Sequence, residues 1–233
     1  MEKHELFRNA LEEQQAFENY DASDLLTIGV RIGSNEVVFK QLYKAYMNGD
    51  STYEYNPRRG AKIEVSFNLK NDEVIIEQLT KEFKFTEELF LSYLNLASLC
   101  YSAIHPMGSV IELDEEMLDD EFKKAFVKEG EPLLAMITGC RVSLPDELEE
   151  YIADYVGRIW PYGEGEERSF FISTLMVKRV VHGGYIDEES DESLMMSKLE
   201  ELILDQKKLM TFLTSKEEEM LAVEVMKNME EMR

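Results

Sequence analysis

Acidic charge is concentrated in one part of this chain, and this uneven distribution restricts how the chain can fold. Residues 1–70 contain 9 Lys and Arg against 11 Asp and Glu, a net charge of -2. Residues 71–233 contain the other 16 basic and 37 acidic residues, a net charge of -21. Self-repulsion of this size opposes a compact state. The hydrophobic content of 44% is nevertheless enough to bury a core, so we expect the carboxylates on folded surfaces more than in a disordered tail. We therefore predict a near-neutral N-terminal module, residues 1–70, and a strongly acidic, mainly helical body, residues 71–233.

Hydrophobic periodicity predicts an α+β fold that is mostly helical and has a small antiparallel sheet. Alternating apolar residues predict strands around residues 61–70, 109–113 and 133–144. Residues 168–185 fit either a strand or a helix. The segment 86–104 is apolar on more than one side, so we expect it to form the central helix. Ser34 is expected to cap a helix, and Ser215 with Glu218 matches a capping box. Helices are predicted at 2–19, 34–48, 71–83, 86–104, 114–128 and 145–160, with two more after residue 194.

One compact basic segment, "YEYNPRRGAK" from Tyr53 to Lys62, interrupts this acidic chain. Residues 31–70 contain seven basic and four acidic residues, a local net charge of +3. We expect residues 53–60 to form a loop in which Arg58 and Arg59 hydrogen-bond phosphates while a tyrosine stacks on a base. The alternative is a surface loop whose arginines pair with the protein's own carboxylates. The residues predicted to bind nucleic acid or a partner are Lys40, Lys44, Tyr53, Tyr55, Arg58, Arg59 and Lys62.

Four clusters of acidic residues occur in the rest of the chain. Carboxylates three or four residues apart on a helix are neighbours at roughly 5–6 Å, and duplex DNA presents one charge per roughly 1.7 Å of its axis. A helix with carboxylates on successive turns can therefore approximate a row of phosphates. The alternative for each cluster is a solvated surface that only keeps the protein in solution. The clusters are Asp114, Glu115, Glu116, Asp119, Asp120 and Glu121; Asp146, Glu147, Glu149, Glu150 and Asp154; Asp187, Glu188, Glu189, Asp191 and Glu192; and Glu217, Glu218 and Glu219.

Sequence signatures of catalysis and of metal or cofactor binding are missing. His4, His105 and His182 are scattered, and no His or Cys pair has the spacing of zinc ligands. The segment "DEESDES" lacks the glycine of a calcium loop, and "YGEGEER" lacks the further glycine of a dinucleotide fingerprint. Acidic pairs arise from composition alone in a chain with 48 acidic residues. We therefore expect no enzyme activity, no catalytic residues, no cofactor and no metal.

Features of secreted and membrane proteins are also missing. Residues 1–15 contain no apolar signal-peptide core, and no apolar run reaches the roughly 18 residues of a membrane helix. Cys100 and Cys140 lie among apolar or small residues, which favours two buried thiols over a disulfide. These patterns predict a cytoplasmic protein without membrane contact, and they leave its oligomeric state open.

The acidic rows "ELDEEMLDDEF" and "PDELEEYIADY", in an acidic chain of this size, give a resemblance to a known class. The chain resembles DNA-mimic proteins of bacteriophages, in particular an early host-takeover protein of large Bacillus phages that targets host RNA polymerase. The resemblance implies a non-catalytic inhibitor whose acidic body occupies the basic DNA channel of the polymerase and blocks transcription. It also implies that the basic module contacts nucleic acid or an acidic polymerase surface.

Two other classes of function stay open at this point. One is a cytosolic immunity protein or antitoxin whose acidic face covers a basic nuclease toxin. The other is an enzyme whose site is assembled from distant residues. The sequence does not distinguish the partner, because an acidic surface complements any basic binding channel.

Overall fold

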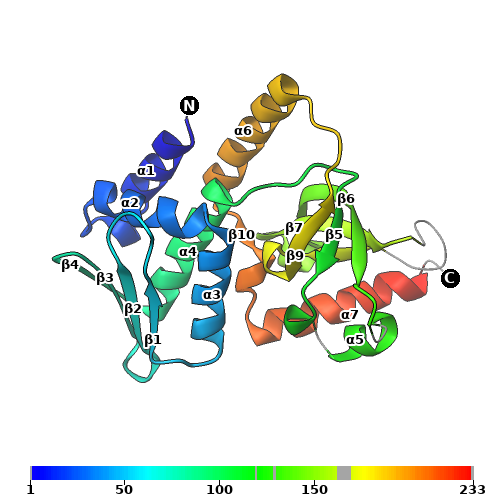
Figure 1. The fold of residues 1–233 in the computed structure, drawn as a ribbon, viewed down its shortest axis with the longest axis horizontal. Coiled ribbons are helices and arrows are strands. Elements are labelled where there is room, and N and C mark those ends of the chain that lie inside the picture. Colours follow the sequence, from blue (N-terminus) through cyan, green and yellow to red (C-terminus); the bar gives the residue numbers. More distant parts are fainter. Residues whose placement is uncertain (1, 119, 128–129, 162–168, 232–233) are drawn as a thin grey trace. The chain divides into compact units, whose positions relative to one another are not determined.

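The chain divides into two compact units, Met1–Ala103 and Ile104–Arg233 (Figure 1). The structure is a computed structural model, and it describes residues 2–118, 120–127, 130–161 and 169–231. The step in charge at residue 70 lies inside the first unit, in the short 3-10 turn η2 (Leu69–Asn71). The acidic part of the sequence therefore contributes elements to both units.

The first unit combines α-helices with an antiparallel sheet. Strands β1 (Thr52–Tyr55), β2 (Ile63–Asn68), β3 (Glu73–Gln78) and β4 (Lys81–Phe85) pair in sequence order. The helical elements are α1 (Lys3–Glu13), η1 (Gln15–Phe17), α2 (Ala22–Gly33), α3 (Glu36–Met47) and α4 (Glu87–Tyr101).

Helix α4 lies at the centre of the first unit, as predicted. It packs against β3 and β4 and also against α1 and α2. Tyr93 on α4 is fully buried, and its hydroxyl donates a hydrogen bond of 2.6 Å to the Leu25 carbonyl of α2. A Cβ at Gly33 would lie 2.4 Å from the carbonyl oxygen of Ala97, so this glycine allows α2 and α4 to approach closely.

The second unit is built on a six-stranded sheet with the order β10-β7-β6-β5-β9, and β8 pairs with β7. All of its strand pairs are antiparallel except the short parallel pair of β10 and β7. The strands are β5 (Val110–Leu113), β6 (Leu134–Ser143), β7 (Tyr151–Ile159), β8 (Phe170–Ile172), β9 (Val177–His182) and β10 (Lys208–Leu209). The helical elements are η3 (Glu115–Met117), α5 (Asp120–Phe126), η4 (Asp146–Leu148), η5 (Thr174–Met176), α6 (Glu188–Leu204), η6 (Met210–Phe212) and α7 (Ser215–Glu231).

Two groups of buried side chains stabilise the second unit. The larger group is centred on β5, β6 and β7, and Phe122 and Phe126 of α5 pack against it. The smaller group contains Leu148 and Tyr151 and is covered by Leu221 of α7 together with residues of η6. The C-terminal helix is therefore attached to the sheet through this second, smaller core.

The predicted fold class is wrong, because the chain forms two sizeable sheets of four and six strands rather than one small sheet. The largest error in the first unit is the helix predicted at 71–83, which is the β3–β4 hairpin. Val74 and Ile76 are fully buried while the residues beside them are more exposed, which is the alternation of a strand. The turn between the strands contains Leu79, whose φ of 57° lies in the left-handed region.

The helix predicted at 145–160 is also wrong, because Pro145 introduces only the short turn η4 and strand β7 follows. Residues 151–155 are buried on both faces of the sheet, so the strand shows no alternation of apolar and polar residues. Residues 52–55, predicted in part as a loop, form β1. The described residues of the ambiguous segment 168–185 contain β8, η5 and β9.

The other sequence assignments are closer to the structure. The strands predicted around 61–70, 109–113 and 133–144 are confirmed as β2, β5 and β6. Two helix caps are each displaced by one residue. Asn35 caps α3 by accepting a hydrogen bond from the Val38 amide, and Thr214 with Glu217 forms the capping box of α7. Among the described residues, no helix is both long and apolar enough to span a lipid bilayer.

Candidate functional site

The basic loop of the first unit exposes two arginines. Arg58 and Arg59 are exposed, and no ion pair joins either of them to a described residue. The base of the loop is supported by Arg31, which donates a hydrogen bond of 3.1 Å from Nη1 to the Ala61 carbonyl. The Arg31 guanidinium also lies under Gly60, whose φ of +103° favours glycine. The loop therefore presents two guanidinium groups from a supported backbone.

Most of the other residues predicted to bind nucleic acid around this loop interact with their own chain. Lys62 forms ion pairs of 2.7 Å with Glu54 and 2.8 Å with Glu64. Tyr53 is half-buried, and its hydroxyl donates to the Val38 carbonyl at 3.3 Å, so its ring is held against α3. Tyr55 is half-buried on β1. Lys40 and Lys44 are half-buried on α3 and interact with other parts of the chain.

The acidic cluster at residues 114–121 is partly used in local structure. Asp114 is half-buried and accepts a hydrogen bond from the Glu116 amide, which caps η3. Asp120 is exposed and pairs with Lys123 at 3.1 Å. Glu115 and Glu116 are exposed. Asp119 and the Glu121 side chain lie outside the described residues.

The cluster at residues 187–192 is described at one position only. Asp187 is exposed and precedes α6. The side chains of Glu188, Glu189, Asp191 and Glu192 lie outside the described residues.

Exposed carboxylates without ion pairs gather where η4 meets the first turns of α7. The two elements pack against each other in the second unit. Every acidic member of this group is exposed and makes no ion pair with the described part of the chain. We call these five residues the acidic rim: Asp146, Glu147, Glu149, Glu218 and Glu219.

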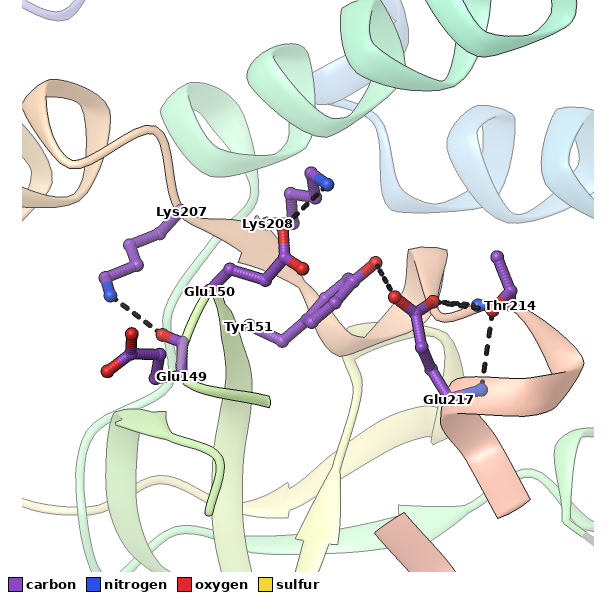
Figure 2. Close-up of polar contacts among 7 residues, drawn as sticks. All are labelled: Glu149, Glu150, Tyr151, Lys207, Lys208, Thr214 and Glu217. Atoms are coloured by element: carbon purple, nitrogen blue, oxygen red, sulfur yellow. Dashed lines mark hydrogen bonds and ion pairs between the residues drawn. The ribbon is translucent and has the colours of Figure 1, made fainter. Parts of the chain in front are cut away.

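A network of polar contacts holds the C-terminal segment against η4 and β7 (Figure 2). Lys207 donates from Nζ to the Glu149 carbonyl at 2.7 Å, and Lys208 pairs with the Glu150 carboxylate at 2.8 Å. The Lys208 ammonium also lies 5.4 Å from the centre of the Tyr151 ring. These contacts involve Lys207 and Lys208, whereas Lys216 on the first turn of α7 lines a groove together with Glu147 and Glu219.

Glu217 belongs to the same network and is not part of the acidic rim. Figure 2 shows its carboxylate between the Tyr151 hydroxyl, which donates to it at 3.0 Å, and Thr214. The Thr214 amide and hydroxyl each donate to Glu217 at 2.7 Å. Burial opposes ionisation of Glu217, but these hydrogen bonds outweigh it and lower the pKa of its carboxyl. Glu217 is therefore an anchor of α7 rather than a surface charge.

An apolar groove of about 400 Å³ lies between η4 and α7, and two residues of the acidic rim, Glu147 and Glu219, line it. Pro145 and Leu148 line one side, and Met220 and Val223 line the other. The charged residues that line the groove are Glu147, Glu219 and Lys216. The sequence analysis named the acidic residues here but missed the groove. The sequence signal that could have indicated the groove is the spacing of Lys216, Glu219, Met220 and Val223, which places them on one helical face.

Asp154, predicted as part of an acidic surface, is instead buried inside the second unit. Its Oδ1 lies 3.1 Å from Nη1 of Arg141, and the two side chains are 1% and 4% exposed. The Thr174 amide donates to Asp154 Oδ2 at 2.9 Å. The ion pair therefore joins β6 to β7, and the hydrogen bond joins β7 to η5.

The polar groups beside this ion pair serve packing as well. Cys140 donates from Sγ to the His105 carbonyl at 3.3 Å, and burial raises the pKa of its thiol. A thiol needs a lowered pKa to act as a nucleophile at neutral pH. The Tyr155 hydroxyl accepts a hydrogen bond from the His105 amide at 3.2 Å. The described residues hold no group of three or more His, Cys, Asp and Glu side chains arranged for a metal ion.

Comparison with known proteins gives one family similarity, and it falls in the second unit. Residues 104–193 are similar to the family described as a domain of unknown function, DUF4176. The similar region begins with the second unit and includes η4, β7 and Asp154, whereas α7 lies beyond it. No match was found among curated proteins or among solved structures.

Proposed function

We propose that this protein is a non-catalytic acidic protein that binds a basic partner and acts as a DNA mimic. In the specific form of the proposal, it occupies the basic DNA channel of bacterial RNA polymerase in the cytoplasm and blocks transcription. The observation that supports this proposal is the acidic rim, whose five carboxylates are exposed and lack ion pairs within the described chain.

Electrostatics explains why such a surface favours a basic partner. The net charge of -23 makes like charges repel across the molecule. Carboxylates that lack a cation in their own chain gain most when a partner supplies one. Complementary potentials also steer association and raise its rate at low salt. A basic DNA-binding channel meets these conditions, because it is built to bind a dense row of phosphates.

A binding role is also supported by how the buried polar groups are used. Asp154 pairs with Arg141, and the Cys140 thiol has a raised pKa. Groups prepared for catalysis are instead expected in a cleft, with pKa values matched to their chemical task. Arg58 and Arg59 fit the same binding role as a second contact point, either to nucleic acid or to an acidic surface of the partner.

The groove supports one alternative, an immunity protein that neutralises a basic nuclease toxin. Phosphate mimicry needs only charges, whereas the apolar lining by Leu148, Met220 and Val223 suits contact with protein side chains. In both functions the acidic rim meets a basic surface, so they differ in the identity of the partner.

Transcription from a linear template by purified bacterial RNA polymerase tests the proposal. The wild-type protein should inhibit transcription, and inhibition should weaken as salt is raised, because screening shortens from roughly 30 to 8 Å. A rim variant with Asn at Asp146 and Gln at the four rim glutamates should inhibit much less. A matched control neutralises five exposed acids of the first unit that make no ion pair with the described chain: Glu12, Glu13, Glu18, Asp50 and Glu77.

The outcomes separate the hypotheses. If the rim variant loses inhibition and the matched control keeps it, the acidic rim carries the activity. Full inhibition by the rim variant, or no inhibition by wild type at any salt, would falsify DNA mimicry of the polymerase. A purified basic nuclease in place of the polymerase then tests the alternative, with loss of nuclease activity as its expected result.

A further inference from the structure

The groove between η4 and α7 indicates which structural element of a partner it could bind. This inference rests on the proposed binding role and specifies what occupies the groove. We propose that the groove binds an amphipathic α-helix of the partner, with apolar side chains on one face and Lys or Arg beside them.

The first argument is that the described side chains of α7, up to Val223, place apolar residues on two faces, and only one of these faces packs onto the core. Leu221 packs onto the small core that contains Tyr151, and Glu217, four residues earlier, is bonded to the Tyr151 hydroxyl. Met220 and Val223 lie on a different face, where they are 37% and 64% exposed. The groove side of α7 is therefore apolar surface that its own chain leaves in contact with solvent.

The second argument is charge complementarity. The groove lining contains Glu147 and Glu219 against Lys216, and Asp146 and Glu149 are the chain neighbours of Glu147 and Leu148. A segment with apolar side chains alone would bury these carboxylates without compensation, which is costly. Lys or Arg side chains can cover apolar surface with their stems while their charged ends reach the rim. The occupant is therefore apolar in the middle and basic at its edges.

The third argument concerns the backbone of the occupant. The groove is walled by the 3-10 turn η4, in which the Leu148 amide donates to the Pro145 carbonyl, and by the helix α7. Strand β7, which follows η4, is paired with β6 on one side and with β10 and β8 on the other. An extended peptide could not pair with β7, which has partners on both sides among the described residues, whereas a helix satisfies its own backbone hydrogen bonds.

Fluorescence anisotropy with a labelled model peptide tests this inference on the full-length protein. The probe is a helix-forming peptide of about 16 residues, or about four turns, with a leucine stripe flanked by lysines and arginines. Two comparison peptides have the same leucine stripe with acidic flanks, or the same composition with the stripe scrambled. The wild-type protein should bind the basic amphipathic peptide saturably and should bind both comparison peptides much more weakly.

Two variants then divide the binding into its apolar and charged parts. Met220→Ser with Val223→Ser should weaken binding about tenfold or more, because complete burial of one apolar side chain is worth on the order of tenfold and these two, 37% and 64% exposed, together gain about that much on binding. Glu147→Gln with Glu219→Gln should weaken it about threefold at low salt and flatten its salt dependence.

A matched control variant tests whether any loss of exposed apolar side chains, rather than loss of those in the groove, weakens peptide binding. Val37→Ser with Leu79→Ser removes two apolar side chains of the first unit that are 63% and 85% exposed, and this variant should bind like wild type. All the substituted side chains are on the surface, and circular dichroism verifies that each variant is folded.

The inference and the proposed function fail in different ways. Equal binding of the peptide by wild type and by the Met220/Val223 variant would overturn the groove inference while leaving the acidic rim as a binding surface. Equal binding of the acidic-flanked peptide would overturn the charge argument. Self-association in sedimentation experiments, abolished by the Met220/Val223 variant, would overturn the inference by showing that a second copy of the chain covers the groove.

Discussion

Removing one member of the buried ion pair between Arg141 and Asp154 is expected to destabilise the second unit strongly. The two side chains are 4% and 1% exposed, and Asp154 also accepts the Thr174 amide. Removing one partner of a buried pair costs about 3–5 kcal/mol, because the remaining charge stays desolvated. Arg141→Met and Asp154→Leu should each lower the free energy of unfolding by this amount. The double variant should lose less than the sum, since it leaves no buried charge.

Urea unfolding followed by tryptophan fluorescence measures this effect within the correct unit. Trp160 is the only tryptophan of the chain, directly follows β7, and lies in the same unit as the ion pair. With an m-value of about 2 kcal/mol/M, the midpoint should fall by about 1.5–2.5 M in each single variant. As a control, Glu149→Gln on the exposed rim should stay within about 0.5 kcal/mol of wild type.

Two results would refute the reasoning. The first is a single variant with unchanged stability, which would mean that Asp154 is solvated and belongs to the acidic surface. The second is a double variant that loses the full sum of the two single effects, which would mean that the two side chains do not interact.

Three further predictions concern other parts of the fold. Arg58→Ala with Arg59→Ala should leave thermal unfolding unchanged but weaken partner or DNA binding at low salt; unchanged affinity would remove the loop from the proposed function. Gly33→Ala should destabilise the first unit by about 1–3 kcal/mol in urea, because its Cβ would meet a carbonyl of α4 at 2.4 Å; an equally stable variant would contradict the close approach. Hydrogen bonds from Lys178 and from Arg179 lower the pKa of the Glu112 carboxyl below its ordinary value of 4.5. The ionised Glu112 therefore stabilises the fold above pH 4.5, and this contribution is lost as the pH falls through the lowered pKa. The stability difference between wild type and Glu112→Gln should therefore shrink on acidification, and a difference that grows would have the wrong sign.

Local sequence patterns were sufficient to predict an element where residues within that element determine its conformation. The alternation of Ile63, Val65 and Phe67 predicted β2, because every second side chain of that strand faces the core. The helix predicted from residue 86 matches the start of α4, where Thr86 accepts a hydrogen bond from the Leu89 amide within one turn. The exposure of most acidic residues also followed from sequence, since a carboxylate without a partner stays in water.

Sequence patterns gave the wrong secondary structure where a strand is buried on both faces, because its apolar and polar residues then do not alternate. Strand β7 is buried along residues 151–155, so its apolar residues fit a helix as well as a strand. The error placed Asp154 on an acidic helical surface. Only the pairing of β7 with β6, which brings Arg141 next to it, shows that this carboxylate is internal.

The acidic residues of the candidate site were named from the sequence, but its apolar residues and its shape were not. The sequence identified Glu147 and Glu219 as acidic and Arg58 as a basic loop residue, since charge is a property of each residue alone. It did not show that Lys62 is paired internally, because both partners lie on strands whose register sets the distance. The groove depends on η4 meeting α7, two elements far apart in the chain. Contacts of that kind arise from packing of the whole unit, and only the tertiary structure determines them.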